Sequence, residues 1–433
     1  MRPWTVACIV VATALAGCAS PAPGATGDDR PEAQQFPLVL RDETPVRDDV
    51  LSDSRDERRS NLRAPGFPLY APADAAMVAF MEDQEIGSGA LAVIRDGKLL
   101  YENGYGTLDG TTATPPDAMF RIASLSKTVT ATVIRTLVDD GVLSWDDHVF
   151  CIPPEPRPDC ILSLPIHPNR PVVDDRVADV SVEDLLGHRT GWDRDSCAPD
   201  YDGQAIEVAE TLGIASPPPA WRNAQWLLGE PMKFAPGEDP GEVDGYCNLG
   251  YRILGLIAEA KTGVTLAGLE SAFIFEPLGI AGDMEPGRTL PENRNPREPN
   301  YKCGDMTPNV YATNETVCEP DGGFNVEGFL GSGGLIATAE AVATVFGAYT
   351  TDGSNWRNET NEMSRISAGS LPGTIAWTTR YITDDGDHIE VAILFNERSS
   401  LNLIGTGVQD VQFFEEQSEL LRTLSGLDSS LPA

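Results

Sequence analysis

The sequence predicts an α+β fold in which both ends of the chain build one antiparallel sheet and a mainly helical segment is inserted between them. Residues 89–102 contain two apolar runs on either side of the turn Asp96-Gly97, a pair typical of tight β-hairpins. Residues 375–395 repeat this pattern around an Asp-rich turn at 384–387. The chain between the two hairpins is punctuated by proline and glycine and has helical spacing of its apolar residues.

The helices are predicted from apolar residues that recur every three to four positions. The first spans about 73–83, just before the N-terminal hairpin, and a second starts near Ser124 and stops at Gly141. Further helices are expected near 181–187, 205–212, 222–229, 249–261 and 338–349, with a final amphipathic helix at about 411–424.

The N-terminus has the pattern of an export signal. Arg2 precedes an apolar run at 6–15, and a Leu-Ala-Gly-Cys sequence ends at Cys18. The run is too short for a stable membrane span, and its end is similar to the bacterial lipobox. We therefore expect residues 1–17 to be a lipoprotein signal peptide and Cys18 to carry a lipid. The protein would then be an exported cell-envelope lipoprotein, periplasmic or on the outer surface, with an ordinary cleaved signal as the alternative.

The rest of the chain divides into a tether and one domain. Residues 18–66 are rich in Pro, Asp, Arg, Ser and Ala without periodicity, which predicts an acidic flexible tether. Residues 67–427 form the predicted domain. Its α/β lobe would comprise 67–141 and 363–427, and its helical lobe 142–362.

The charge balance excludes one class of partner. The chain has 31 Lys and Arg residues against 66 Asp and Glu residues, a formal net charge of −35 at pH 7. A phosphate backbone would be repelled, so we expect no nucleic-acid partner. Such acidity is commonly a solubility trait and identifies no substrate.

The cysteines suggest disulfides rather than a metal site. Six of the eight follow the predicted tether, and an even set in an exported chain favours disulfides. The chain has no Cys-x-x-Cys pair and no His-rich cluster, so a zinc site is not expected. Six cysteines allow 15 pairings, and partly reduced, buried thiols are the alternative. The short loops favour Cys151–Cys160 and Cys303–Cys318, which leaves Cys197–Cys247.

The sequence around Ser124 has the pattern of an activated nucleophile. A serine hydroxyl needs a neighbouring base near neutral pH, and Lys127 lies three residues later, on the same helix face. Ser124 would also lie at a helix N-terminus, where free N–H groups favour developing negative charge. The alternative is a surface helix start with Ser124 or Ser126 as its N-cap.

A second polar pair precedes the helix predicted at 249–261. Tyr246 and Asn248 are two residues apart, so both can face one site. Nearby cations could lower the pKa of the Tyr246 hydroxyl and make it a proton shuttle, while the Asn248 amide could fix a substrate or the lysine. In the alternative interpretation, Asn248 only caps the following helix.

Taken together, Ser124-x-x-Lys127 and, 122 residues after the serine, Tyr246-x-Asn248 resemble the serine β-lactamase and penicillin-binding-protein superfamily. The branch closest in kind contains class C β-lactamases, D-alanyl-D-alanine carboxypeptidases and related esterases. The resemblance runs from about residue 75 to 425 and implies a β-lactamase/transpeptidase-like fold. Three further stretches, at 185–191, 276–280 and 331–338, also resemble sequences of this family.

The resemblance implies a third motif, Lys-Thr-Gly or His-x-Gly, on a strand beside the serine. Residues 261–263 read Lys-Thr-Gly, but they end a predicted helix, where glycine is a normal C-cap. The positional match is at 367–373, with Ser367 in place of the cation, followed by Gly369 and Ser370.

Replacing that cation changes the expected substrate. Ser367 can donate a hydrogen bond but carries no charge, which weakens the case for substrates with a carboxylate and leaves esters and neutral amides open. Arg365 would lie on the same strand face two residues earlier and could substitute; solvent exposure of Arg365 is the alternative.

The resemblance implies acyl transfer without a metal or organic cofactor. Lys127 would accept the Ser124 proton, Tyr246 would protonate the leaving group and Asn248 would orient the substrate. Ser367, Gly369 and Ser370 would line the substrate site, and the backbone N–H groups of Ser124 and Ser370 would hold the oxyanion. The substrate would be a small molecule or peptide with a scissile ester or amide.

Two functional classes follow from these motifs. The first is a serine hydrolase, whether esterase, D-Ala-D-Ala peptidase or β-lactamase-like enzyme. The second is a catalytically decayed relative with a binding or sensing role in the envelope. No Gly-x-Ser-x-Gly elbow accompanies the four histidines, so a Ser-His-Asp triad is not expected and His188 is interpreted as structural.

Overall fold

The computed structural model describes residues 71–197, 204–350, 353, 365–382 and 386–398. The predicted signal peptide, the lipid-bearing Cys18, the tether and the helix at 411–424 lie outside these residues. The lobe boundaries stay a prediction. Among the described residues, no helix combines the length and the apolar character needed to cross a bilayer.

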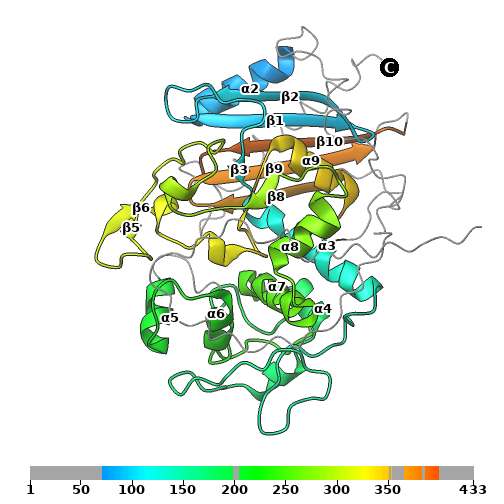
Figure 1. Cartoon of the computed structure of the whole chain (residues 1–433), viewed down its shortest axis with the longest axis vertical. Helices are drawn as coiled ribbons and strands as arrows, with labels where there is room; N and C mark the ends of the chain where they lie inside the picture. The colour runs from blue at the N-terminus through cyan, green and yellow to red at the C-terminus, as the bar shows by residue number, and fades with distance from the viewer. Residues whose placement is uncertain (1–70, 198–203, 351–352, 354–364, 383–385, 399–433) are drawn as a thin grey trace, which may run out of the picture. The chain divides into compact units, whose positions relative to one another are not determined.

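A five-stranded antiparallel sheet, in the order β2-β1-β10-β9-β8, is the framework of the fold (Figure 1). The N-terminal and C-terminal hairpins meet at β1 and β10, where Gly89 pairs with Phe395 and Arg95 with Ile389. The predicted α+β fold with one sheet from both chain ends is therefore confirmed. The strands are β1 (Ser88–Arg95), β2 (Lys98–Gly106), β8 (Arg365–Leu371), β9 (Thr374–Ile382) and β10 (His388–Phe395).

The first hairpin has the turn that its sequence predicts. Asp96 has a φ of 48° and Gly97 a φ of 75°, and a two-residue hairpin turn of this hand needs positive φ at both positions. The two strands therefore twist together rather than splay apart.

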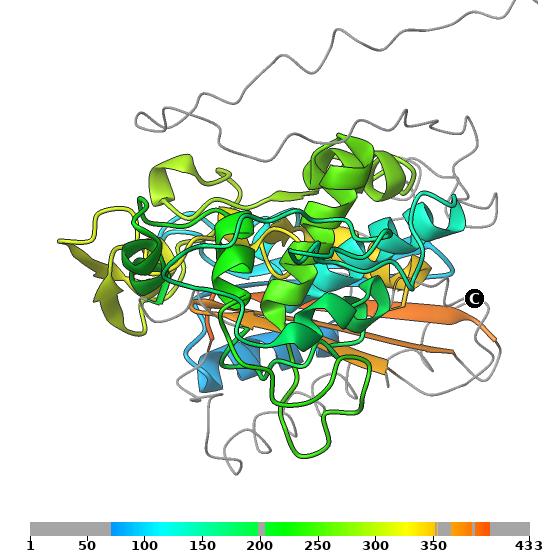
Figure 2. The same cartoon turned by 90° about the horizontal axis from the view of Figure 1, so that it is seen from below.

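Both faces of the sheet are covered. Alternate residues such as Ala92 and Leu394 face α9 (Ala339–Ala348) and the inserted helices, whereas Leu91 and Ile393 face α2 (Ala71–Asp83). Figure 2 shows α2 on one side of the sheet and most of the inserted helices on the other. The side-chain period of two in a strand produces this division.

A carboxylate anchors α2 to the sheet. Asp74 accepts hydrogen bonds from the Tyr101 hydroxyl, from the Tyr105 hydroxyl at 2.7 Å and from the Asn103 amide at 3.1 Å. These three residues occupy every second position of β2 and therefore lie on one face of the strand. A single residue of α2 thus contacts three positions of the strand.

The inserted segment contains the predicted helices. These are α3 (Ser126–Asp139), α4 (Val182–Leu186), α5 (Gln204–Leu212), α6 (Ala220–Leu227) and α7 (Asn248–Thr262), and α9 follows near the end of the insertion. A short helix, α8 (Leu266–Glu270), continues into a π-helical turn at Ser271–Phe275 and was not predicted.

Two small sheets also escaped prediction. One has the order β3-β7-β4, and the other pairs β5 with β6. Strands of two or three residues are too short to show periodicity, and their pairing depends on distant partners. Their bounds are β3 (Phe120–Arg121), β4 (Met284–Pro286), β5 (Met306–Pro308), β6 (Thr316–Cys318) and β7 (Leu335–Ala337).

Three disulfides form with the pairing favoured by loop length. They join Cys151 to Cys160, Cys197 to Cys247 and Cys303 to Cys318. The second joins positions 50 residues apart and ties the segment before α7 to the turn that ends at Cys197.

Candidate active site

Ser124 lies on a tight turn that leads directly into α3. Residues Ala123–Leu125 form a 3₁₀ turn, and the Ser126 N–H donates to the carbonyls of Ala123 and Ser124. The nucleophile candidate thus precedes the α-helix by two residues instead of lying within it, because 3₁₀ geometry often begins a helix. Ala123 has a φ of 49°, a conformation rare for alanine.

Lys127 is buried and directed at three acceptors. Its ammonium donates to Ser124 Oγ at 3.1 Å, to Asn248 Oδ1 at 2.8 Å and to the Ser332 carbonyl at 2.6 Å. Only 6% of the residue is exposed. The amine is therefore held against the serine by acceptors from two distant segments.

Tyr246 reaches the same serine from the segment before α7. Its hydroxyl donates to Ser124 Oγ at 2.9 Å, and Lys127 Nζ lies 5.0 Å from the centroid of its ring. One serine oxygen thus contacts both candidate proton carriers, and Ser124 itself is partly exposed.

Asn248 does not cap α7. Cys247 is the N-cap, and its sulfur accepts the Gly250 N–H at 3.2 Å. Asn248, the first helical residue, directs its carbonyl oxygen to Lys127. The structure thus places this amide beside the lysine and assigns the capping role to its neighbour.

Burial and neighbouring charges shift the pKa values of both proton carriers, Lys127 and Tyr246. Burial lowers the pKa of Lys127, and the positive charge of Arg194 adds to this effect. Burial alone would raise the pKa of Tyr246, but the charge and hydrogen bonding of Lys127 outweigh it and lower that pKa overall. An amine with a lowered pKa can accept the proton of a serine hydroxyl.

Strand β8 passes directly over the nucleophile turn at Gly369. A Cβ there would lie 2.3 Å from the Ile122 carbonyl oxygen and 2.8 Å from the Ser124 nitrogen, so only glycine allows this approach. Ser367 is two residues earlier, on the same face of the strand, and is partly exposed. Nothing is described for the side chain of Arg365.

Ser370 lies on the opposite face of β8 from Gly369. Its hydroxyl is buried and has no hydrogen-bond partner among the described residues. Within the described chain, β8 is the edge of the sheet, and alternate backbone N–H groups of an edge strand lack a ladder partner.

His188 has a structural role, and its partners were not predicted from the sequence. Its Nδ1 accepts the Cys247 N–H at 3.0 Å, and its ring lies 4.4 Å from the Tyr246 ring and 5.1 Å from the Tyr251 ring. Burial, then the charges of Lys127 and Arg194, lower the pKa of His188 to about 4. The imidazole is therefore neutral near pH 7 and available as an acceptor.

Two other contacts at the site were missed by sequence reasoning. Arg194 lies with its guanidinium carbon 4.5 Å from the centroid of the Tyr246 ring, and the Ser332 carbonyl accepts from Lys127. Every residue has a backbone carbonyl, so the sequence cannot show which carbonyl accepts from Lys127. In the sequence, Arg194 also cannot be distinguished from the other exposed arginines. The Gly-Ser-Gly-Gly stretch at 331–334 was the one available cue for the second contact.

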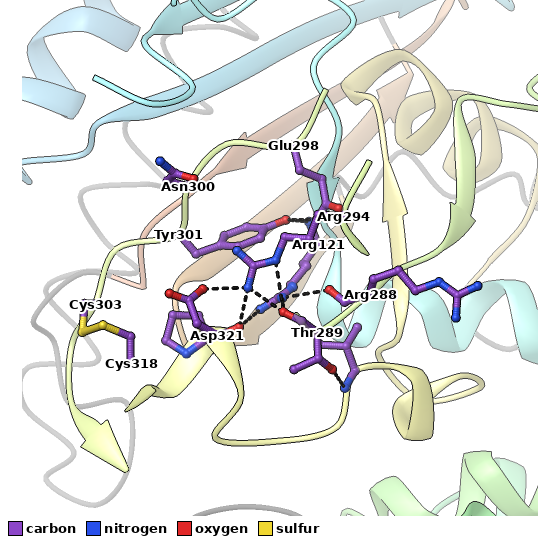
Figure 3. Close-up of polar contacts among 12 residues, drawn as sticks. Arg121, Arg288, Thr289, Arg294, Glu298, Asn300, Tyr301, Cys303, Cys318 and Asp321 are labelled. Atoms are coloured by element: carbon purple, nitrogen blue, oxygen red, sulfur yellow. Dashed lines mark hydrogen bonds and ion pairs between the residues drawn. A yellow bond between two sulfur atoms is a disulfide. The ribbon is translucent and has the colours of Figure 1, made fainter. Parts of the chain in front are cut away.

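A buried arginine supports the nucleophile turn from behind. Arg121, three residues before Ser124, donates to the Pro320 carbonyl at 2.9 Å and lies 4.3 Å over the Tyr301 ring. Its own N–H donates to the Tyr301 hydroxyl, and its carbonyl accepts from Thr374. Figure 3 shows Arg121 and its neighbour Arg294 converging beside Tyr301.

The alternative third motif is structural. Lys261 and Thr262 end α7, and Gly263 follows with a φ of 71° as its C-cap. Lys261 pairs with Asp147 at 3.4 Å. The Lys-Thr-Gly letters at this position therefore mark a helix end.

The chain is similar in sequence to several curated proteins. The chain is 28% identical over 236 residues to the esterase EstB of Burkholderia gladioli, covering 51% of this chain and 54% of that protein. It is 28% identical over 222 residues to penicillin-binding protein 4 of Amycolatopsis lactamdurans, covering 49% and 48%. The chain thus spans about half the length of these curated relatives.

A solved structure extends the likeness over most of the fold. The D-amino acid amidase of Ochrobactrum anthropi SV3, complexed with L-phenylalanine amide, superposes with a TM-score of 0.55 at 18% identity, covering 82% of this chain and 99% of that chain. At this identity the superposition shows the fold alone. The family model described as Beta-lactamase matches residues 73–387. The chain therefore belongs to the Beta-lactamase family.

Proposed function

We propose that this protein is an exported, lipid-anchored serine hydrolase that forms an acyl-enzyme on Ser124. The observation that carries the proposal is the convergence of two proton carriers on one oxygen. Lys127 Nζ lies 3.1 Å and the Tyr246 hydroxyl 2.9 Å from Ser124 Oγ. The esterase and penicillin-binding relatives add support from the family.

In the acylation step, Lys127 accepts the proton of Ser124 and the serine oxygen attacks the substrate carbonyl carbon. The negative charge moves to the carbonyl oxygen, and the backbone N–H groups of Ser124 and Ser370 are the proposed donors to it. The carbon–leaving-group bond then breaks as Tyr246 gives its proton to the departing atom, and the proton held by Lys127 returns to Tyr246.

Deacylation follows the reverse order of proton transfers. Tyr246 first passes its proton back to Lys127 and then takes a proton from a water molecule, whose oxygen attacks the ester carbonyl carbon of the acyl-enzyme. The bond to Ser124 Oγ breaks, and the serine oxygen takes the proton from Lys127, which leaves Lys127 neutral and Tyr246 protonated for the next cycle. Asn248 keeps the lysine oriented through both steps with its 2.8 Å contact.

The proposed substrates are esters or neutral amides. Ser367 lies on the same face of β8 as Gly369, which contacts the nucleophile turn. A serine there offers a hydrogen bond and no charge to compensate a carboxylate. An uncharged acyl group or leaving group therefore fits the strand better than a carboxylate-bearing one.

Labelling by a fluorophosphonate probe tests the nucleophile. Wild type should be labelled, Ser124→Ala should not, and Ser271→Ala, a partly exposed serine on the π-helical turn, should label like wild type. Absence of labelling in folded wild type would favour the non-catalytic binding protein. A panel of p-nitrophenyl esters, nitrocefin and D-Ala-D-Ala peptides then ranks the substrates, and we expect the esters to be hydrolysed fastest.

The lipid anchor is tested separately from catalysis. In detergent phase separation of bacterial cells that express the full chain, wild type should partition into the detergent phase and Cys18→Ala into the aqueous phase. A Cys18→Ala protein that still enters the detergent phase would contradict the anchor and leave the hydrolase proposal intact.

A further inference from the structure

We propose that Arg194 is a positioning residue that helps the Lys127–Tyr246 pair to give up one proton, so that Lys127 can accept the Ser124 proton while Tyr246 keeps its own, although Arg194 belongs to no recognised motif. The inference rests on the proposed function and adds to it a residue that shifts the working pH of the site. Arg194 acts on the reaction through Tyr246, with no required contact to substrate.

The position of the Arg194 side chain is determined by the segment that carries Tyr246. Its guanidinium carbon lies 4.5 Å from the centroid of the Tyr246 ring, a cation–π distance. Its Nε pairs with Asp244 at 2.5 Å, and its backbone N–H donates to the Asp244 carbonyl at 2.7 Å. The other Asp244 oxygen accepts the Tyr246 N–H at 3.1 Å.

Covalent and backbone ties connect the same two segments. The turn that begins beside Arg194 ends at Cys197, which is disulfide-bonded to Cys247. The Leu249 N–H also donates to the Cys197 carbonyl at 3.2 Å. The guanidinium is thus held over the phenol ring even though 51% of the Arg194 side chain is exposed.

The charges around Tyr246 make Arg194 influential. His188 is neutral near pH 7 because its pKa is lowered to about 4. Burial would raise the pKa of the Asp244 carboxyl, but the hydrogen bonds from Arg194 and from the Tyr246 N–H, together with the charge of Arg194, lower it overall. Among the described residues, the charges that act on the phenol are those of Lys127 and Arg194, and Arg194 is held in place by its ion pair with Asp244.

Arg194 favours the form of the pair that has lost one proton. Its charge lowers the pKa of Lys127, and it also contributes to the lowered pKa of Tyr246. Without it, the pair would release its proton at higher pH. For a half-exposed charge 4.5 Å from the centroid of the phenol ring, the expected displacement is roughly 0.5 to 1 pH unit, smaller at high salt.

The pH dependence of fluorophosphonate labelling tests this role in the full chain. In Arg194→Gln the acidic limb of the labelling rate should move to higher pH by about 0.5 to 1 unit, while Arg194→Lys should stay near wild type. The matched control is Arg176→Gln, which removes an arginine with a 42% exposed side chain that pairs with Asp174 and should leave the limb in place. High salt should move the acidic limb of wild type to higher pH, toward the limb of Arg194→Gln.

A second readout needs no activity. The tyrosinate absorbance that disappears in Tyr246→Phe should titrate at higher pH in Arg194→Gln than in wild type. If this titration and the labelling limb are both unmoved, while the rate falls equally at all pH values, Arg194 is only structural and the inference is wrong. If wild type never labels but the titration moves, the hydrolase proposal fails and the electrostatic role stands.

Discussion

The Nδ1 atom of His188 accepts the backbone N–H of Cys247 at 3.0 Å. This bond connects a left-handed residue, with a φ of 55°, to the residue that follows the catalytic candidate Tyr246. The histidine ring also packs against the Tyr246 ring. A residue that resembles a catalytic base by type is therefore a support for the tyrosine, and it can accept this bond only while neutral.

Substitution of His188 should show this support directly. His188→Ala leaves a buried N–H without its acceptor and places alanine at positive φ, so we expect labelling of Ser124 to fall by roughly 10- to 100-fold, about 1 to 3 kcal/mol. His188→Asn keeps a side-chain acceptor and tolerates positive φ, and should retain more activity. Equal losses in both variants, measured as labelling rates, would contradict this account.

The contact of Asn248 with Lys127 predicts a charge-dependent effect. Asn248→Asp would put a carboxylate next to the ammonium and raise the pKa of Lys127, on the order of 2 units. Labelling at pH 7 should drop about 100-fold and recover partly at pH 9. Asn248→Ala only removes one acceptor, so its loss should be smaller and nearly independent of pH. A pH-independent loss in Asn248→Asp would show that the amide acts by geometry alone.

The disulfide between Cys197 and Cys247 should matter for both stability and the site. Cys197→Ala opens the 50-residue link and leaves the Cys247 sulfur available as the cap of α7. Chain entropy predicts a loss of about 4 kcal/mol in the free energy of unfolding, against about 3 kcal/mol for the short Cys151–Cys160 loop. Chemical denaturation measures both.

Labelling separates the two crosslinks further. Cys197→Ala should slow the labelling of Ser124 because the segment that carries Tyr246 loses its tie. Cys151→Ala serves as the control and should label at the wild-type rate. Slowed labelling in both variants would point to a general loss of stability.

Arg121 should be required for a well-placed nucleophile turn. Arg121→Met removes the donor to the Pro320 carbonyl and the stack on Tyr301, so we expect about 2 to 3 kcal/mol lower stability and slower labelling. Arg121→Lys restores a charge without the planar fork and should recover only part of either loss. Thermal denaturation and labelling together check this, and unchanged values in Arg121→Met would refute the role.

Glu270 predicts a pH-dependent stability. Its carboxylate oxygens are buried without hydrogen-bond partners among the described residues, and burial, with a contribution from Glu259, raises its pKa to about 8. Between the unfolded value of about 4.3 and that of the folded state, the folded protein binds the extra proton. The free energy of unfolding should therefore fall as the pH rises from about 5 to 8.

Glu270→Gln should flatten this part of the stability profile, because the amide has no proton to lose. Glu210→Gln, a change at an exposed glutamate of α5, should keep the wild-type slope. Urea denaturation at several pH values measures the slopes. The same slope in Glu270→Gln and wild type would show that another group is responsible.

Local patterns were sufficient for much of the fold and part of the site. The hairpin turn at Asp96-Gly97 and the spacing of Ser124 and Lys127 depend on neighbouring residues, so the Asp-Gly pair between apolar runs and the helical periodicity reveal them. The short strands β3, β4 and β7 have no such signal, since they exist only where three distant segments pair.

By itself, the sequence determined the central sheet, the main helices, the nucleophile–lysine spacing and the tyrosine–asparagine pair, because these are properties of short stretches of chain. Only the tertiary structure decided that Tyr246 meets Ser124, that Ser332 contributes a carbonyl to Lys127, and that Arg194 lies over the phenol ring. These contacts join segments up to 205 residues apart. Their geometry follows from packing, crosslinks and backbone conformation that no local pattern encodes.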